Sequence, residues 1–221
     1  PFVLVDQFTG GVNSLWVGTN NSLYHLSTGD GSIQSQLPIG LRFRNDPGLD
    51  SGWIVRPNLN YLFAPCDNGK IYCRQSTKLD TIPDGWKGRN GQTDGEFNAG
   101  SPITTMVAGP TPEGTPEVKY LYFGTEDGKL YKIRADNGTL VWTYQAGGKI
   151  SSTPLPPFLT DGIYVYFGCD DGYFYAIHKD TREMRTGFPI CTGAEITESP
   201  FFVNGNMHIL SADGVMYAIT P

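Results

Sequence analysis

The residue types that most often do chemistry in enzymes form no familiar catalytic motif in this chain. Gly-Lys pairs begin at Gly69, Gly128 and Gly148, but Ile or Leu follows each lysine, where a phosphate-binding loop needs Ser or Thr. The sequence also lacks the G-x-S-x-G, H-E-x-x-H and C-x-x-C patterns. We therefore expect no enzymatic activity, no cofactor and no metal site.

Charged and aromatic side chains instead gather in the segments between repeating units of the chain. Arg, carboxylate and aromatic groups that meet on a concave surface are typical of peptide or glycan recognition. We expect these segments to reach one face of the molecule, which we call the axial face, and to form a binding surface there. The candidate binding residues are Asp50, Trp53, Arg56, Arg89, Glu96, Phe97, Lys149, Glu195 and Glu198.

The elements that must position these residues follow a repeat. Five times an aromatic, apolar run is followed by a polar turn, which usually ends in Gly, and then by an apolar residue and a tyrosine. Successive tyrosines are 48, 59, 44 and 42 residues apart, which is typical of one four-stranded propeller blade. These tyrosines are Tyr24, Tyr72, Tyr131, Tyr175 and Tyr217.

The turns of the repeat predict β-hairpins. A two-residue type I′ turn needs residues that tolerate positive φ, and Asn-Gly or Asp-Gly meets that need. Four repeats carry such a pair, and the first has Asn20-Asn21 instead. One strand is expected before each hairpin and one after it, which gives four strands a unit. The Asn-Gly and Asp-Gly pairs begin at Asn68, Asp127, Asp171 and Asp213.

These observations predict an all-β, five-bladed β-propeller of four-stranded antiparallel blades, built as a single domain. The expected blades cover residues 1–48, 49–98, 99–147, 148–193 and 194–221. The last blade is incomplete, because too few residues follow Tyr217 for an outermost strand. Propellers often borrow that strand from the N-terminal segment, but residues 1–5 align as an innermost strand instead.

The segment from Gly124 to Pro154, GTEDGKLYKIRADNGTLVWTYQAGGKISSTP, resembles the repeat of the pyrroloquinoline-quinone-like β-propellers. Residues 186–189 and 114–118 are similar to FG-GAP propeller repeats. Propellers of the first family are mostly extracytoplasmic, so the resemblance implies a periplasmic, secreted or cell-surface location. Its quinone enzymes have a larger ring and an adjacent cysteine pair, which this chain lacks, so the resemblance implies neither the quinone nor dehydrogenase activity.

Composition limits the partners. The chain has 221 residues, a formal net charge of -6 and a pI of about 5.0, so we expect no nucleic-acid partner. No run approaches the roughly 18 apolar residues of a membrane span, so we expect no membrane insertion. Cys66, Cys73, Cys169 and Cys191 could form two disulfides or stay as thiols, and the sequence leaves both open.

Three functions fit this sequence. The first is a non-catalytic binding or scaffold propeller that recognises a protein or peptide on its axial face. The alternative is a lectin-like propeller that binds carbohydrate between blades, although the unequal links between blades offer no repeated pocket. The third is a glycoside-processing enzyme, which needs acidic residues on the innermost strands. The stretches expected there, 103–107 and 201–203, contain none.

Overall fold

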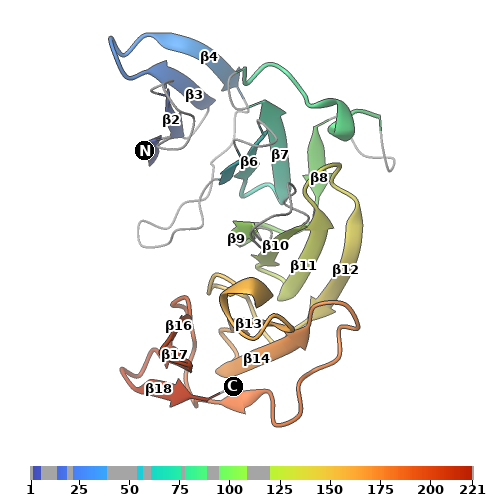
Figure 1. The fold of residues 1–221 in the computed structure, drawn as a ribbon, viewed down its shortest axis with the longest axis vertical. Helices are drawn as coiled ribbons and strands as arrows, with labels where there is room; N and C mark the ends of the chain where they lie inside the picture. Colours follow the sequence, from blue (N-terminus) through green and yellow to red (C-terminus); the bar gives the residue numbers. More distant parts are fainter. Residues whose placement is uncertain are drawn as a thin grey trace. The chain divides into compact units, whose positions relative to one another are not determined.

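The structure is a computed structural model, which describes residues 2–5, 14–18, 22–38, 54–56, 61–75, 78–88, 95–108 and 120–220. Within these ranges the protein is all-β, apart from two short 3-10 turns (Figure 1). No described helix is long and apolar enough to cross a membrane. Contacts between residues divide the chain into two compact units. The first is Pro1–Pro102 with Asp136–Gly138, and the second is Ile103–Ala135 with Thr139–Pro221.

The first unit holds two four-stranded antiparallel sheets. The first sheet runs β1 (Phe2–Val5), β2 (Ser14–Gly18), β3 (Ser22–Ser27) and β4 (Ile33–Pro38). The second sheet runs β5 (Ile54–Arg56), β6 (Tyr61–Pro65), β7 (Lys70–Gln75) and β8 (Glu96–Asn98), with the 3-10 turn η1 (Asp84–Trp86) between β7 and β8. Since β1 pairs with β2, it is the innermost strand of the first sheet, as the sequence predicts.

The second unit holds three sheets. The third sheet runs β9 (Ile103–Ala108), β10 (Tyr120–Thr125), β11 (Lys129–Arg134) and β12 (Leu140–Gln145). The fourth has η2 (Pro157–Leu159), β13 (Tyr164–Gly168), β14 (Tyr173–His178) and β15 (Ile190–Cys191). The fifth has β16 (Phe201–Val203), β17 (Asn206–Leu210) and β18 (Met216–Ile219). Every strand of the five sheets lies inside one of the expected blade ranges.

The hairpins are confirmed, but the predicted turn type is wrong. In the second sheet the Cys66 N–H donates to the Lys70 carbonyl (2.9 Å), and the Gly69 N–H donates to the Cys66 carbonyl (3.2 Å). Gly69 has φ +79°, whereas Asn68 has a negative φ, and a type I′ turn needs positive φ at both central residues. The loop is a three-residue connection that ends in a left-handed glycine. Glycine is required there, because a Cβ would lie 2.8 Å from the Ser101 carbonyl oxygen.

The other three predicted Gly hairpins have the same N–H to carbonyl bond, made by Gly128, Gly172 and Gly214. All three glycines have positive φ. The Asn20-Asn21 turn lies outside the described residues.

The innermost strand of the fourth sheet is reduced to a single bridge. Leu155 and Tyr166 exchange two backbone hydrogen bonds, of 2.7 and 3.0 Å. Pro157 has no N–H, so the ladder cannot extend past Leu155 in that direction, and in the other direction the Ser152 hydroxyl accepts the Gly168 N–H (2.7 Å) in place of a backbone group. The fourth blade therefore has three strands and a bridge where four strands were expected.

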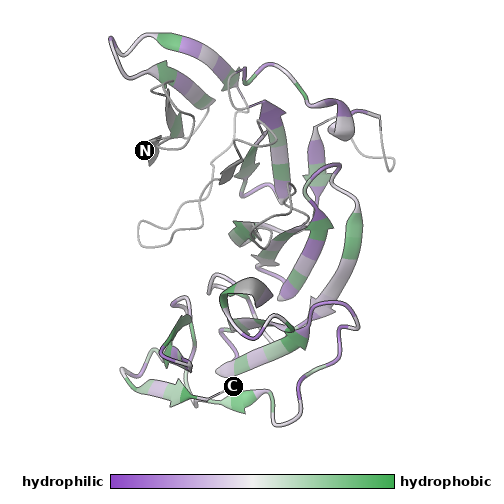
Figure 2. Ribbon diagram, viewed as in Figure 1, coloured by the Kyte–Doolittle hydropathy of each residue, from purple (hydrophilic) through white to green (hydrophobic). Residues whose placement is uncertain are grey.

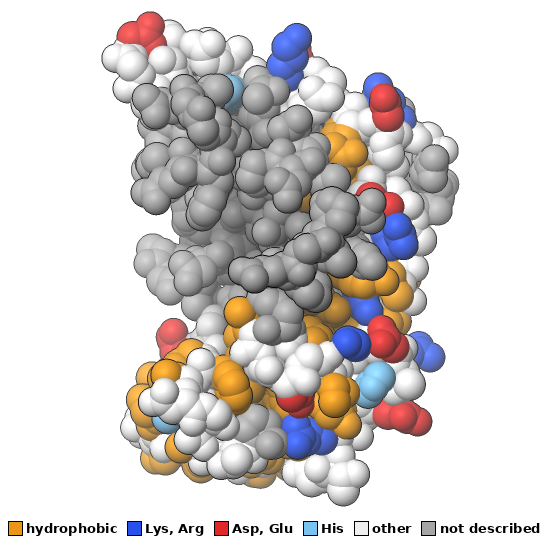
Figure 3. Space-filling model, viewed as in Figure 1, with side chains coloured by type: hydrophobic (Ala, Val, Ile, Leu, Met, Phe, Trp, Pro, Cys, Tyr) orange, Lys and Arg blue, Asp and Glu red, His pale blue; other side chains and the backbone are white. Residues whose placement is uncertain are grey.

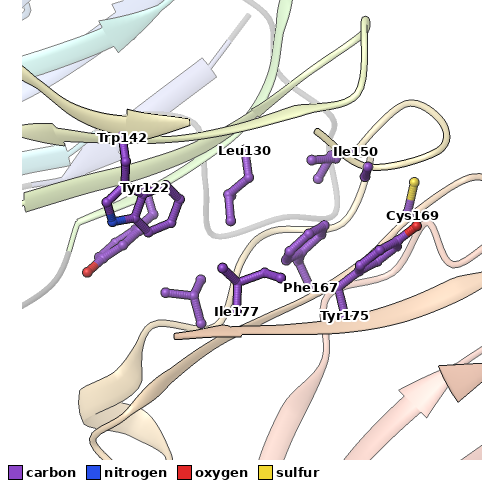
Figure 4. Packing of buried hydrophobic residues seen from close by; sticks show 10 residues of the cluster. Tyr122, Leu130, Trp142, Ile150, Phe167, Cys169, Tyr175 and Ile177 are labelled. Atoms are coloured by element: carbon purple, nitrogen blue, oxygen red, sulfur yellow. The ribbon is translucent and has the colours of Figure 1, made fainter. Parts of the chain in front are cut away.

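Apolar side chains on facing sheets make the core. Between the third and fourth sheets, Trp142, Tyr122 and Leu130 face Ile177 and Phe167 (Figure 4). The fourth and fifth sheets share a second cluster, formed by Tyr166, Phe174, Ala176, Ile196, Met207 and Ile209. In the first unit, Leu23 of the first sheet packs with residues of the second sheet, which include Leu62, Ala64 and Tyr72. Three of the repeat tyrosines, Tyr72, Tyr131 and Tyr175, are buried in this packing.

Candidate functional site

In the second unit, the hairpin loops and the links between sheets lie at the same end of the sheets. The Asp170 N–H donates to the Lys149 carbonyl (2.9 Å), and the Ala212 N–H donates to the Glu195 carbonyl (2.8 Å). We call this end the link face, and its segments are 146–153, 169–172, 192–199 and 211–214. The expectation that links and hairpin turns share one face is confirmed for this unit.

In the fourth and fifth sheets a small polar residue fastens the hairpin to the link beside it. The Cys169 thiol contacts the carbonyl of Gly148 at 3.2 Å, and the Ser211 hydroxyl donates to the carbonyl of Ala194 at 3.3 Å. Both side chains are buried. Both positions therefore hold a small residue whose hydrogen-bonding atom reaches the neighbouring link.

Asp170 is the centre of the charged part of the link face. Its Oδ2 accepts a hydrogen bond from the Ser151 hydroxyl (3.0 Å), while its buried Oδ1 has no hydrogen-bond partner among the described residues. Burial raises the pKa of the Asp170 carboxyl, and the charge of Glu195 raises it further. The Ser151 hydrogen bond and the positive charge of Lys149 oppose this rise in pKa. One oxygen of this carboxyl is therefore buried without a donor from the described residues.

The structure brings three of the predicted site residues to this face. Lys149 and Glu195 lie close enough to Asp170 to change its pKa, and Glu195 and Glu198 are both exposed. Asp170 and Ser151 were missed. Asp170 comes just before the Asp171-Gly172 turn, where an aspartate is an ordinary turn residue, so its role could not be predicted from the sequence.

Two predicted residues lie elsewhere. The sequence analysis expects Glu96 and Phe97 in a segment between repeating units, but both belong to β8, the outer strand of the second sheet. Phe97 is only 2% exposed, and Glu96 forms an ion pair with Lys70 (2.7 Å). Neither residue offers a free group to a ligand. The short β8 was missed because it has only three residues.

Of the four remaining predicted residues, the structure describes only Arg56. Arg56 ends β5, where its backbone pairs with Tyr61. Asp50, Trp53 and Arg89 lie outside the described residues, and their part in a binding surface stays a prediction. In the described part of the chain no group of three or more His, Cys, Asp or Glu side chains could hold a metal ion.

A buried lysine joins the third and fourth sheets and has a structural role. The Lys132 ammonium donates to the Lys179 carbonyl (2.7 Å) and lies 3.3 Å from Asp180 Oδ1. It also lies 4.0 Å from the centroid of the Tyr120 ring, and burial lowers its pKa. Trp142 Nε1 donates to the same Lys179 carbonyl (2.8 Å). The Lys132 ammonium thus has its partners within the fold, namely the Lys179 carbonyl, the Asp180 carboxylate and the Tyr120 ring.

A second polar network lies around Asp161, at the end of the fourth sheet away from the link face. Asp161 Oδ2 accepts hydrogen bonds from the Tyr166 hydroxyl (2.8 Å) and from Arg185 (3.1 Å). Its Oδ1 accepts the backbone N–H groups of Ile163 (2.9 Å) and Tyr164 (3.0 Å). In contrast to Asp170, both carboxylate oxygens of Asp161 are satisfied by the protein.

Solved structures show which fold these sheets form. BamB from Moraxella catarrhalis is 16% identical, with a TM-score of 0.66, and the match covers 99% of this chain and 57% of that chain. Sqt1 from Saccharomyces cerevisiae is 13% identical, with a TM-score of 0.68, and the match covers 99% and 58% of the two chains. The WD40 propeller domain of Doa1 is 13% identical, with a TM-score of 0.56, over 93% and 60%.

The chain thus spans less than two thirds of the length of these structures. No family model matches the sequence, and no curated protein matches it either. At such low identity the likeness establishes the fold alone. Together with the five antiparallel sheets, it shows that this protein has the all-β, bladed fold of a β-propeller.

Proposed function

We propose that this protein is a non-catalytic binding propeller that recognises a protein or peptide partner on its axial face, through the link face of the second unit. The observation that carries the proposal is the cluster around Asp170. A buried carboxylate oxygen without a partner lies beside a lysine and an exposed glutamate. Preformed, polar groups of this kind orient a ligand and give specificity.

The chemistry of the cluster suits a polar segment of polypeptide. Lys149 can donate to a carbonyl or a carboxylate of such a segment, and the Asp170 carboxylate beside it attracts positive charge, although its Oδ1 is itself buried. The exposed Glu195 and Glu198 add negative charge at the rim, where charges mainly steer the encounter with a partner. We therefore expect a partner segment that contains both basic residues and free backbone groups.

The assignment of a propeller family and a cellular location rests on the sequence of the repeat. The resemblance of residues 124–154 to pyrroloquinoline-quinone-like repeats supports a relationship to that family, and the likeness to BamB agrees with it. We propose on the same basis that the protein works outside the cytoplasm. No quinone is implied.

Selection from a phage-displayed library of random peptides on the immobilised protein tests the proposed surface. We expect selected peptides to bind at least about tenfold more weakly to Glu195→Lys and Lys149→Glu, because each reverses a charge beside Asp170. Glu183→Lys is the matched control, since Glu183 is exposed and its carbonyl accepts the His178 N–H in the turn that follows β14, away from the link face.

Peptides whose affinity is unchanged by both link-face substitutions would contradict the proposal. A glycan array gives the second readout. Binding of sugars, without selection of any peptide, would favour the carbohydrate-binding alternative.

A further inference from the structure

One peptide group after β14 joins the fourth sheet to the third. Its carbonyl, that of Lys179, accepts hydrogen bonds from the Lys132 ammonium (2.7 Å) and from Trp142 Nε1 (2.8 Å), which belong to β11 and β12. Its N–H, that of Asp180, donates to Nδ1 of His178 (3.2 Å). The third sheet therefore holds this peptide group at its C=O, while His178 holds it at its N–H.

His178 also holds a second backbone group of this segment, residues 178–183, which we call the β14 turn. Its Nδ1 accepts the Thr181 N–H (3.1 Å) as well. A backbone N–H can only donate, so Nδ1 carries no proton and the neutral ring has its proton on Nε2. The ring lies perpendicular to that of Tyr164 in β13, with 5.7 Å between the ring centroids. These two bonds of the β14 turn therefore depend on a neutral His178.

Hydrogen bonds, more than apolar burial, keep the shape of the β14 turn. Residues 180–183 are all exposed. Figure 2 shows hydrophilic colouring in the turn, and in Figure 3 acidic and basic side chains gather at the lower right, where Figure 1 places it. Arg182 has φ +67°, a left-handed conformation that costs free energy in a residue other than glycine. The turn therefore needs its hydrogen bonds to keep this backbone.

Charges of both signs lie on the elements around His178. Carboxylates favour a positively charged ring and cations oppose it, so their effects partly cancel. Asp180 is also 3.3 Å from the Lys132 ammonium, and Arg185, which pairs with Asp161, lies 5.1 Å from the centroid of the Tyr164 ring. The hydrogen bonds at Nδ1 are then what distinguishes the neutral from the charged ring. The charged residues of these elements are Lys132, Lys179, Asp180, Arg182, Glu183 and Arg185.

We propose that His178 is a pH-sensitive switch at the junction of the third and fourth sheets. Histidine ordinarily gains a proton between about pH 8 and pH 5. A proton on Nδ1 turns an acceptor into a donor that faces two N–H groups, so both bonds are lost. Without the bond at its N–H, the 179–180 peptide group can rotate, and its carbonyl aligns less well with Lys132 and Trp142. Acidification therefore loosens the junction, while each sheet keeps its own ladder.

NMR spectroscopy of the full chain of 221 residues tests the switch. In a proton–nitrogen correlation spectrum of the His178 ring we expect a proton on Nε2 alone near pH 7.5, and on both nitrogens near pH 5. Hydrogen exchange at the Asp180 and Thr181 amides and at Trp142 Nε1, each relative to an unstructured peptide at the same pH, should be about five to ten times faster near pH 5. That change corresponds to the loss of about one hydrogen bond.

Two substitutions separate this switch from other titrations. His178→Asn keeps an acceptor, because an Asn side chain can bond the backbone N–H two residues on, but it does not titrate in this range. Exchange at Trp142 Nε1 should then no longer change with pH. His208→Asn is the matched control, since His208 lies in the fifth sheet, stacked on Phe201 with 4.9 Å between ring centroids. The pH response of Trp142 should remain in that variant.

Several results would overturn this assignment. One is a neutral His178 ring with its proton on Nδ1, which needs no variant and decides the matter if His178→Asn does not fold. Another is exchange at Trp142 Nε1 that is equally protected at both pH values, or whose pH response persists in His178→Asn. A response that is lost in His208→Asn would assign the switch to His208 instead. The β14 turn lies away from the link face, so these results do not depend on the proposed function.

Discussion

Two aspartates of the fourth sheet have opposite environments. Asp161 accepts five hydrogen bonds, two of them from backbone N–H groups, and lies 3.1 Å from the Arg185 guanidinium. Asp170 keeps one buried oxygen without a partner. The first carboxylate stabilises the fold, whereas burial of an Asp170 oxygen without a hydrogen bond costs free energy of folding.

Asp161→Asn should lower the free energy of unfolding near neutral pH. Burial raises the pKa of this carboxyl, but its hydrogen bonds and Arg185 lower it more, so its pKa in the folded protein is below the usual 3.8. A lowered carboxyl pKa stabilises the fold above the usual pKa, and this stabilisation is lost as the pH falls through the folded value. We expect a loss of about 1 kcal/mol at pH 7, kept small by partial exposure.

Urea unfolding of the protein and of Asp161→Asn at pH 7 and at low pH measures this difference. The gap between the two proteins should narrow below a pH of about 3.8. A gap that does not change with pH would show that Asp161 acts by shape alone.

Asp170→Asn should change the free energy of unfolding in the opposite direction. Burial, helped by Glu195, raises the pKa of Asp170, so ionisation of this carboxyl opposes folding above its usual pKa. We expect the variant to be as stable as the protein at pH 7 or slightly more stable, by well under about 1 kcal/mol because the group is partly exposed. The same urea titrations measure it. A clear loss of stability would mean that the carboxylate has an unseen structural partner.

The sequence could supply part of this site and not the rest. Lys149 and Glu195 were predicted because they interrupt a repeat and carry charge. Asp170 was not, because it sits in a turn where an aspartate is common, and the state of its Oδ1 depends on three-dimensional packing. Phe97 was mistaken for a surface residue because its three-residue strand has too little alternation to be recognised.

At the scale of elements, the packing of each link against the sheet before it depends on one glycine. A Cβ on Gly124 would lie 2.6 Å from Ile150 Cγ2, and a Cβ on Gly168 would lie 2.6 Å from Ile196 Cβ. Neither glycine has positive φ, so close approach and not backbone conformation explains both. These contacts hold the links, and with them the charged residues of the link face, against the sheets.

Gly168→Ala should therefore destabilise the protein by about 1–3 kcal/mol, since an added methyl in a packed contact forces its neighbours to move. Thermal or urea unfolding measures the loss. The second substitution Ile196→Ala in the same chain should recover part of the effect of Gly168→Ala by making room. Gly29→Ala is the control, because its nearest neighbour is Ser27 Oγ at 3.6 Å and no change is expected there.

Periodicity explains why the elements were predictable and why details were not. Asn-Gly and Asp-Gly located four hairpins, but the choice between a two-residue and a three-residue loop depends on the register of the strands, which the dipeptide does not set. Pro157 ends the ladder on one side of Leu155 because it has no N–H, which could have been predicted from the sequence, whereas the pairing of the Ser152 hydroxyl with Gly168 on the other side depends on packing.

For the whole molecule, the cysteines bear on stability and reactivity. None of the four takes part in a disulfide, and all four lie in the described part of the chain. Burial raises the pKa of Cys66 to about 11 and that of Cys169 to about 12, and it also raises the pKa of Cys73. Cys191 is exposed.

Reductant should therefore leave the melting temperature unchanged. One thiol, that of Cys191, should react quickly with a thiol reagent in the native protein, and Cys191→Ser should abolish this fast phase. The other three should react only on unfolding. Mass spectrometry after timed alkylation measures both phases, and a melting temperature that falls on reduction would reveal a disulfide in solution.

The fifth sheet differs from the third and fourth sheets at one position, which decides whether another link can pack against it. Where the third and fourth sheets have Gly124 and Gly168, the fifth has Leu210, which projects from the sheet and is partly exposed. Copies of the fourth sheet could be joined in tandem, because Gly168 leaves room for the isoleucine of the next link. The fifth sheet has Leu210 at this place, so its use between two other sheets would first require Leu210→Gly.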